Sequence, residues 1–333
     1  MCTVGQRFTK PDAYQSLGCD YFIFDSVIPT ATGLSSSEDE HAWKLFKSVS
    51  WTQQPKPEFG ISFPGRYATD LPTALSSSVT NELKQLFAKG YRSFGVLNCH
   101  GTVSFLSGTT GTKFGELFNT IFNAMTAAQR DAGLKTFFIG LQASYGVTTL
   151  SDNLMHDVIA IRHLNLLIMQ SHIVPLPPLT ASNCHIYPSS SWSQASIVND
   201  SYSSVERASA LLYHAPSTRH LQAFAISFSM AVNMFAISSS PSFTNTRFRD
   251  SCITSAVTSL NDICLLPTAN VVIQTNSTES VQRGYVTGKR FVFSYSTAEN
   301  MAELYNKSKP ARSWAFCWRT SSSITHTAVL VAR

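Results

Sequence analysis

Short apolar segments alternate with amphipathic segments along the chain, and this alternation restricts the possible fold more than any other feature of the sequence. Each apolar segment carries Phe, Ile, Val or Leu at successive positions, so both faces of the predicted strand are apolar. Strands of this kind belong in a parallel sheet that is covered on both faces. We predict strands over residues 2–4, 20–24, 59–63, 93–97, 136–141, 164–169, 223–228, 291–295 and 314–318.

Helical spacing of apolar residues marks the segments between these strands. In the clearest case, Phe114, Leu117, Phe118 and Ile121 recur on one helix face, and Gly133 follows as a stop signal. The pattern Ser203-x-x-Glu206 is a capping box that opens another helix. The sequence predicts helices over residues 38–47, 81–89, 114–128, 152–162, 203–213, 250–260 and 298–305.

The order of strand and helix predicts the fold class. It continues through the chain without a linker, which favours a single (β/α)8-barrel domain over residues 1–333. The alternative is a doubly wound open sheet, but its G-x-G-x-x-G fingerprint after the first strand is absent. We therefore expect an α/β TIM barrel.

Composition and charge exclude several classes of function. Hydrophobic residues make up 44% of the chain, charged residues 14%, and the net charge of +5 is scattered without a run of Lys or Arg. We expect a globular protein with no nucleic-acid partner. The most apolar stretch, 221–237, is interrupted by polar residues, so no membrane association is expected. Cysteine spacing typical of zinc sites is absent, and no metal or cofactor is predicted.

Cysteines and glycosylation sequons favour a secreted, extracellular protein. The chain has seven cysteines, which fit several disulfides with one free thiol, or a fully reduced cytosolic protein. We predict Cys2–Cys19 as the first disulfide and Cys252–Cys264 as the second, although spacing does not determine connectivity. Three sequons, at Asn199, Asn276 and Asn306, add weight to the secretory route and are candidate glycosylation sites.

Several segments resemble the strand motifs of the family 18 glycoside hydrolases, the chitinases. Residues 94–101 look like the third-strand motif Ser-x-Gly-Gly, and 133–142 look like the fourth-strand motif Gly-Phe-Asp-Gly-x-Asp-x-Asp-x-Glu. Residues 169–172 resemble the sixth-strand Met-x-Tyr-Asp, and Trp318 stands where the family has a tryptophan under the sugar. In this alignment the strand at 59–63 is merged into a crossover or counted as an extra strand. The opening Cys2-Thr3-Val4 is also similar to divergent chitinase-like proteins of tick saliva and gut.

The resemblance fails at the residues that the family uses for catalysis. Under this alignment the acid Glu is replaced by Gln142, and the three Asp positions hold Lys135, Phe138 and Gly140. The Tyr-Asp pair holds Ser171 and His172. An amide cannot deliver a proton to the glycosidic oxygen, and loss of positioned acid–base catalysis costs about 10²–10⁴ in rate. The resemblance therefore implies an inactive protein that acts by binding.

The partner implied by this reading is a glycan in the remnant cleft or a host protein on the loops above the barrel. Candidate ligand-binding residues are Gln142, Met169, His172 and Trp318. One alternative is a hydrolase of another class with a refitted barrel mouth that uses Asp25, His172 or Glu303. A structural or storage role is the third hypothesis. We interpret Cys99, next to His100, as a disulfide-bonded or buried cysteine rather than a nucleophile.

Overall fold

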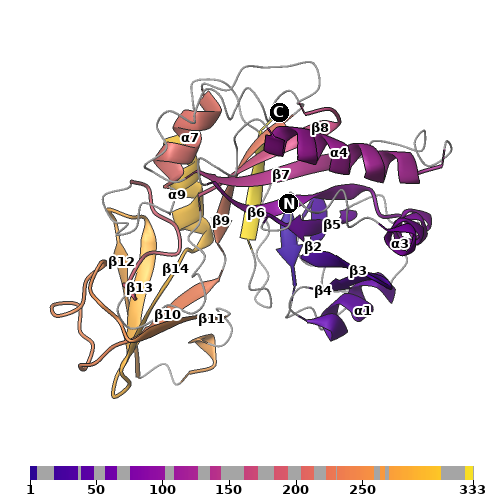
Figure 1. Ribbon diagram of the computed structural model, residues 1–333. Helices are drawn as coiled ribbons and strands as arrows, with labels where there is room; N and C mark the ends of the chain where they lie inside the picture. The colour runs from indigo at the N-terminus through magenta and orange to yellow at the C-terminus, as the bar shows by residue number, and fades with distance from the viewer. Residues whose placement is uncertain are drawn as a thin grey trace.

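A computed structural model gives the arrangement of the chain (Figure 1). It describes residues 1–5, 19–36, 39–48, 57–65, 76–101, 109–126, 136–143, 161–171, 184–193, 204–213, 223–229, 231–258, 263–266, 270–308 and 327–332. The predicted strand at 314–318 and nearly all of the predicted helix at 152–162 lie outside these residues.

Eight strands close into a barrel, which confirms the predicted α/β barrel fold. Around the barrel the order is β1-β15-β9-β8-β7-β6-β5-β2. Their bounds are Cys2–Val4 (β1), Tyr21–Asp25 (β2), Glu58–Pro64 (β5), Ser93–Gly101 (β6), Thr136–Ala143 (β7), Leu164–Gln170 (β8), Ala223–Ser229 (β9) and Thr327–Ala332 (β15). From β1 to β9 every neighbouring pair is parallel.

The strand that closes the barrel differs from the prediction. β15 pairs antiparallel with both β1 and β9, and its sequence was not predicted as a strand. The segment at 59–63, which the alignment treated as surplus, is β5 and lies between β2 and β6. Its apolar residues are buried on both sides of the sheet, as those of a parallel barrel strand must be.

Polar capping residues precede four of the five described helices. The five are α1 (Glu40–Ser48), α3 (Ser77–Ala88), α4 (Thr109–Ala124), α7 (Val205–Tyr213) and α9 (Ala298–Ser308). The four with these capping residues are α1, α3, α7 and α9. The Asp39 carboxylate accepts from the backbone N–H of His41 and Ala42, at 2.8 and 3.1 Å. α7 is capped by Ser204, one residue after the predicted cap, because the Ser204 hydroxyl accepts from Arg207 N at 3.1 Å.

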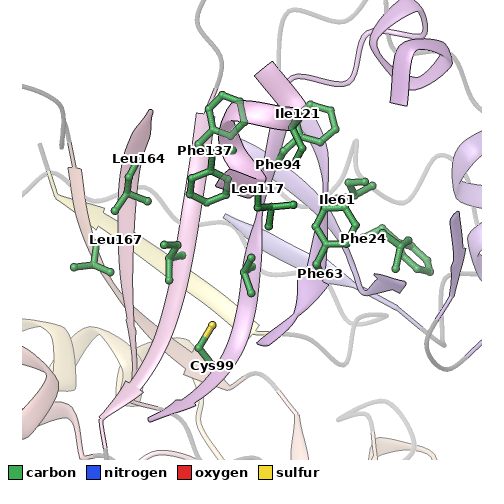
Figure 2. Close-up of a cluster of buried hydrophobic side chains, with 14 of the residues drawn as sticks. Phe24, Ile61, Phe63, Phe94, Cys99, Leu117, Ile121, Phe137, Leu164 and Leu167 are labelled. Atoms are coloured by element: carbon green, nitrogen blue, oxygen red, sulfur yellow. The ribbon is translucent and has the colours of Figure 1, made fainter. Parts of the chain in front are cut away.

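Phenylalanines join the helices to the outer face of the barrel. Phe46 of α1 lies over Phe24 of β2, Phe87 of α3 over Phe94 of β6, and Phe118 of α4 over Phe137 of β7. The ring centroids in these pairs are 4.8–5.2 Å apart. Figure 2 shows part of this layer, in which strand and helix side chains interdigitate. The apolar stripes seen in the sequence are therefore the stripes that cover the sheet.

A five-stranded antiparallel sheet follows the seventh barrel strand. It consists of β10 (Val232–Ala236), β11 (Thr254–Thr258), β12 (Val271–Asn276), β13 (Val281–Val286) and β14 (Phe291–Tyr295), in the order β11-β10-β14-β13-β12. In Figure 1 it lies beside the barrel, in orange. A smaller hairpin, β3 (Val27–Thr30) with β4 (Gly33–Ser36), follows β2.

This sheet corrects two predictions. The segment 291–295 is a strand, but it lies in the middle of the antiparallel sheet and not in the barrel series. The predicted helix at 250–260 is wrong, because residues 254–258 form the edge strand β11 against β10. Most of β11 is exposed, so tertiary pairing rather than burial of an apolar stripe determines its conformation. The assignment of residues 1–333 to one domain stays a prediction.

Two disulfides are present among the described cysteines. Cys2–Cys19 is confirmed, with Cα atoms 5.9 Å apart, and it ties β1 to the residues that precede β2. The predicted Cys252–Cys264 pair is wrong: Cys252 bonds to Cys184, with a Cα separation of 4.9 Å. Cys264 is an exposed thiol and Cys99 a buried one. Cys184 lies beside Cys252 because their backbones are hydrogen-bonded, Cys252 N to Cys184 O at 2.8 Å.

None of the described helices has the length and apolarity needed to cross a membrane. Within the same residues, no group of three or more His, Cys, Asp or Glu side chains could hold a metal ion.

Packing inside the barrel predicts that Gly60 does not tolerate a larger side chain. A Cβ at this position would overlap the backbone carbonyl oxygen of Ser93, which cannot move without distorting β6. We expect Gly60→Ala to lower the free energy of unfolding by about 1–3 kcal/mol, the usual cost of overpacking. Gly115→Ala on α4 is the control: a Cβ there meets nothing within 4 Å, and alanine is favoured in helices by about 1 kcal/mol. Urea denaturation would measure both, and equal stabilities would contradict the packing argument.

The second disulfide makes a further prediction. Non-reducing peptide mapping should recover a cross-linked Cys184–Cys252 peptide. Cys252→Ser should destabilise the protein by about 2–5 kcal/mol, as removal of a native disulfide from a small secreted domain commonly does. Cys264→Ser should leave the thermal midpoint unchanged because this exposed thiol has no disulfide partner among the described cysteines. A Cys252–Cys264 peptide would contradict the structure.

Candidate functional site

Polar side chains replace apolar ones inside the barrel at the carboxyl ends of its strands. Lower in the barrel the interior is apolar, with buried side chains that include Ile23, Leu97, Phe138, Leu166 and Ile168. At the carboxyl ends lie Asp25 of β2, Ser62 of β5, Asn98 of β6 and Gln170 of β8. Since side chains alternate between the two faces of a strand, Asp25 follows Ile23 and Gln170 follows Ile168 on the inner face. Barrels of this class form their ligand sites at this end.

A chain of hydrogen bonds joins these four residues, which we call the mouth network. The Ser62 hydroxyl donates to Asp25 Oδ1 at 2.6 Å, and Asn98 Nδ2 donates to Asp25 Oδ2 at 3.2 Å. Gln170 Nε2 donates to Asn98 Oδ1 at 2.8 Å. Ser62 and Gln170 are buried, whereas Asp25 and Asn98 are partly exposed. Oδ1 of Asp25 thus accepts a hydrogen bond from the adjacent strand β5, and Oδ2 accepts one from β6 beyond it, which fixes the orientation of the carboxylate.

A bulge in β6 selects which side chain reaches the network. The pairing of β6 with β7 shifts between Val96 and Cys99, and Asn98 has a left-handed backbone with φ of 56°. The side chains of Leu97 and Asn98 both face the barrel interior. The side chain of Cys99 points outward into the buried layer between the sheet and the helices, as Figure 2 shows. Asparagine tolerates this backbone conformation better than most residues.

The position of Cys99 lowers the reactivity of its thiol. It is completely buried, and burial raises the pKa of its thiol, with the negative charge of Asp25 raising it further. The thiolate is the nucleophilic form of cysteine, so the fold suppresses its reactivity. The interpretation of Cys99 as a buried thiol is confirmed.

Gly140 makes room for the hydrogen bond between Gln170 and Asn98. β7 stands between β6 and β8 in the barrel, so Asn98 and Gln170 must meet across it. A Cβ on Gly140 would lie 2.6 Å from Leu97 Cδ2 and 3.6 Å from Gln170 Cδ. The absence of a side chain at this position therefore lets Leu97 and Gln170 fill the space above β7.

The neighbouring serines are occupied by backbone contacts. Ser171 is fully buried, its hydroxyl donates to Ser227 O at 2.5 Å, and its N–H donates to Ser227 Oγ at 3.1 Å. This pair fastens the end of β8 to β9. Ser171 takes the place of the family's sixth-strand tyrosine in the sequence alignment, and it serves structure here.

Polar groups also occur at the opposite end of the barrel. The Glu58 carboxylate accepts from the Ser93 hydroxyl at 2.7 Å, and burial raises its pKa. Conserved or buried polar groups at this amino end of a barrel ordinarily contribute to stability rather than to ligand contact.

The residues predicted to bind a ligand fall at different places. Met169 is completely buried in the layer between sheet and helices, away from the mouth. Phe138 fills the barrel interior, and Gln142 lies near the end of β7, opposite His100 in β6. Lys135, His172, Trp318 and Asn199 lie outside the described residues. Of the residues named for the alternative hydrolase, Asp25 lies in the mouth network, whereas Glu303 lies on α9 and pairs with Lys307 at 2.7 Å.

Sequence reasoning missed Ser62, Asn98 and Gln170 as site residues. A polar residue at the end of each apolar run was a signal for Ser62 and Gln170. No sequence signal marks the bulge that turns Asn98 inward.

The observed strand order gives a second alignment to the family motifs, by strand rank, beside the one that places Gln142 at the acid position. β5 is third, β6 fourth and β7 fifth when counted from β1. Ser62-Phe63-Pro64-Gly65 therefore occupies the place of the third-strand Ser-x-Gly-Gly. The fourth-strand motif falls without a gap on residues 90–99, where Gly90 and Tyr91 match its glycine and aromatic residue. The acid position then holds Cys99 rather than Gln142, and the three Asp positions hold Arg92, Gly95 and Leu97.

Thiol labelling tests the placement of Cys99. In the native protein at pH 8, iodoacetamide should modify Cys264 and leave Cys99 unmodified, as read by peptide mass spectrometry; denaturation should expose Cys99. Folding raises the pKa of Cys99, so the folded state favours the neutral thiol. The contribution of this preference to the free energy of unfolding is fully present below the ordinary pKa of 9.0 and is lost as the pH rises above it. The stability of Cys99→Ala should fall less steeply above pH 9. Labelling of native Cys99 would contradict the burial.

Comparison with known proteins adds the fold family. No protein-family model and no curated protein matches the sequence. Among solved structures, the chain is similar to an immunomodulatory active chitinase from Trichuris suis, at 11% identity over 92% of this chain and 87% of the other, with a TM-score of 0.66. A class V chitinase from Nicotiana tobaccum matches at 11% identity over 92% and 89%, with a TM-score of 0.63.

A family 18 N-acetylglucosaminidase from Paenibacillus barengoltzii matches at 9% identity over 92% of this chain and 90% of the other, with a TM-score of 0.61. The similarity covers nearly the whole length of both partners in each case. At these identities it establishes the architecture and not the activity. The chain has the fold of the family 18 chitinases.

Proposed function

We propose that this protein is a secreted, catalytically inactive chitinase-like protein that binds a glycan at the carboxyl end of its barrel. The observation that carries the proposal is the mouth network, in which a serine, an asparagine and a glutamine surround Asp25. It offers hydrogen-bonding groups where the resembled family has acids.

The absence of a usable acid supports inactivity. Hydrolysis in the resembled family needs a protonated Glu at the glycosidic oxygen, and β6 contains no Asp or Glu. Cys99, at the acid position, faces away from the mouth and stays protonated. Both carboxylate oxygens of Asp25 accept a hydrogen bond in the mouth network, so the carboxylate is arranged as an acceptor.

The chemistry of the mouth network supports recognition of a polar, uncharged ligand. Amide and carboxylate groups pair with the hydroxyl and acetamido groups of sugars through hydrogen bonds of fixed direction. Within the network one N–H of Asn98 and the carbonyl oxygen of Gln170 are not used, so both donor and acceptor capacity remains. The structure of a family 18 chitinase from Cycas revoluta is a complex with (GlcNAc)3, which makes N-acetylglucosamine oligomers the first probes.

Secretion is supported by the two disulfides, which persist in oxidising compartments and are rare in the cytosol. The similarity to tick saliva and gut proteins stays a prediction from sequence.

Native mass spectrometry with N-acetylglucosamine oligomers tests the proposal, since it detects bound and cleaved sugar together. We expect intact sugar bound one to one, and at least about tenfold weaker binding by Asn98→Gly, equivalent to about 1.4 kcal/mol. Glycine adopts the left-handed backbone of Asn98 readily, so the bulge is kept. Arg249→Gly is the matched control, because exposed Arg249 also has positive φ (80°) and lies beyond the barrel strands.

The other outcomes separate the alternatives. Cleaved sugar would overturn inactivity and favour the hydrolase hypothesis, in which case Asp25→Asn should abolish cleavage. If the sugar is neither bound nor cleaved, the proposal of a glycan ligand would be overturned, and a host protein bound on the loops would be favoured.

A further inference from the structure

We propose that Asn276 is an N-glycosylation site and that its glycan shields the edge strand β12 from pairing with another chain. The inference concerns the antiparallel sheet and is independent of the ligand at the barrel mouth. It requires passage through the secretory route, which the two disulfides favour.

β12 is a terminal strand of the five-stranded sheet and pairs with β13 alone among the described strands. Its sequence, Val-Val-Ile-Gln-Thr-Asn, is uncharged, contains no proline and is rich in β-branched residues. Ile273 is 46% exposed. Natural edge strands are usually blunted by charged residues, proline, bulges or a covering element, because a bare edge templates association. The described part of β12 carries none of these devices.

The sequon lies at the end of this strand in a well-held turn. Asn276 is the last residue of β12, and Ser277 and Thr278 are exposed in the turn to β13. Asn276 Oδ1 accepts from Glu279 N at 3.1 Å, which leaves the amide nitrogen, the atom that would carry the sugar, outside this bond. An oligosaccharide on this side chain would stand at the end of the edge strand.

Contacts with other parts of the chain hold the turn in place. Glu279 is buried, and its carboxylate accepts from the Ser191 hydroxyl at 2.5 Å. Lys307 of α9 donates to the Ser280 hydroxyl at 3.1 Å. The two residues after the sequon are thus anchored, while the sequon itself faces solvent.

The sequon at Asn306 is presented differently. It lies within α9, where Ser308 is buried and its hydroxyl donates to Tyr305 O at 2.7 Å. Lys307 between them is held by Glu303. Acceptor sequons that carry glycans are expected in surface loops, and only the sequon at Asn276 meets this description among the two that the structure describes.

The modification transfers an oligosaccharide from a lipid diphosphate donor of the secretory pathway. The Asn276 amide nitrogen forms a bond to the anomeric carbon while the bond from that carbon to the diphosphate oxygen breaks. The amide gives up one proton, and the lipid diphosphate leaves.

Secretion of the full chain from eukaryotic cells tests the site. Glycopeptide mapping should find on Asn276 an N-glycan that peptide-N-glycosidase removes, with the matching decrease in intact mass. Thr278→Ala should lose this mass while keeping the Asn276 side chain, and Asn306→Gln should retain it as the matched control. An unmodified Asn276 in secreted wild-type protein would overturn the proposal.

Sedimentation velocity tests the shielding. The Thr278→Ala protein should sediment faster as its concentration rises, whereas the glycosylated protein should stay monomeric over the same range. Adding Ile273→Lys to Thr278→Ala should restore the monomer, because an edge lysine opposes strand pairing. If Thr278→Ala alone stays monomeric, the glycan would stand as a modification and the shielding role would be overturned.

Discussion

Closure of a small barrel leaves little room inside, and the rest of the structure depends on how this room is filled. Gly60, Gly95 and Gly140 each face a neighbour that a Cβ would strike: the Ser93 carbonyl, Phe138 and Leu97. Large side chains thus pack against glycines around the interior, as in close-packed barrels of this size. Phe138 and Leu97 plug the barrel below the mouth, so any ligand must be bound above them.

The same packing prepares the mouth network. Because Gly140 has no side chain, Gln170 reaches Asn98 across β7, and Asn98 in turn reaches Asp25 beside Ser62. Four strands are joined by directed hydrogen bonds at the place where barrels of this class hold ligands. Hydrogen bonds between its members hold the partly buried network in one arrangement, and fixed positions suit recognition of hydroxyl groups.

The antiparallel sheet beyond the barrel differs from the barrel in the burial of its strands. Its outer strands β11 and β12 are partly to largely exposed, whereas β10 and β14 at its centre are mostly buried. The Cys184–Cys252 disulfide fastens the residues that precede β11 to the segment 184–193. Ser294 of β14 also donates to Tyr187 O of that segment at 2.9 Å. The sheet is therefore tied to the segment 184–193, while β12 forms its outer edge.

The sequence by itself determined the barrel class, seven of its strands, the five described helices and the Cys2–Cys19 disulfide. Each of these follows from a local pattern, since apolar runs and helical stripes report burial, and close cysteines on adjacent strands report contact. Burial patterns do not name partners, so the rank of β5, the antiparallel sheet and the Cys184–Cys252 bond were decided by tertiary structure. The candidate site was decided there too. A one-residue bulge reverses the faces of a strand, and it alone puts Asn98 in the mouth and Cys99 in the outer core.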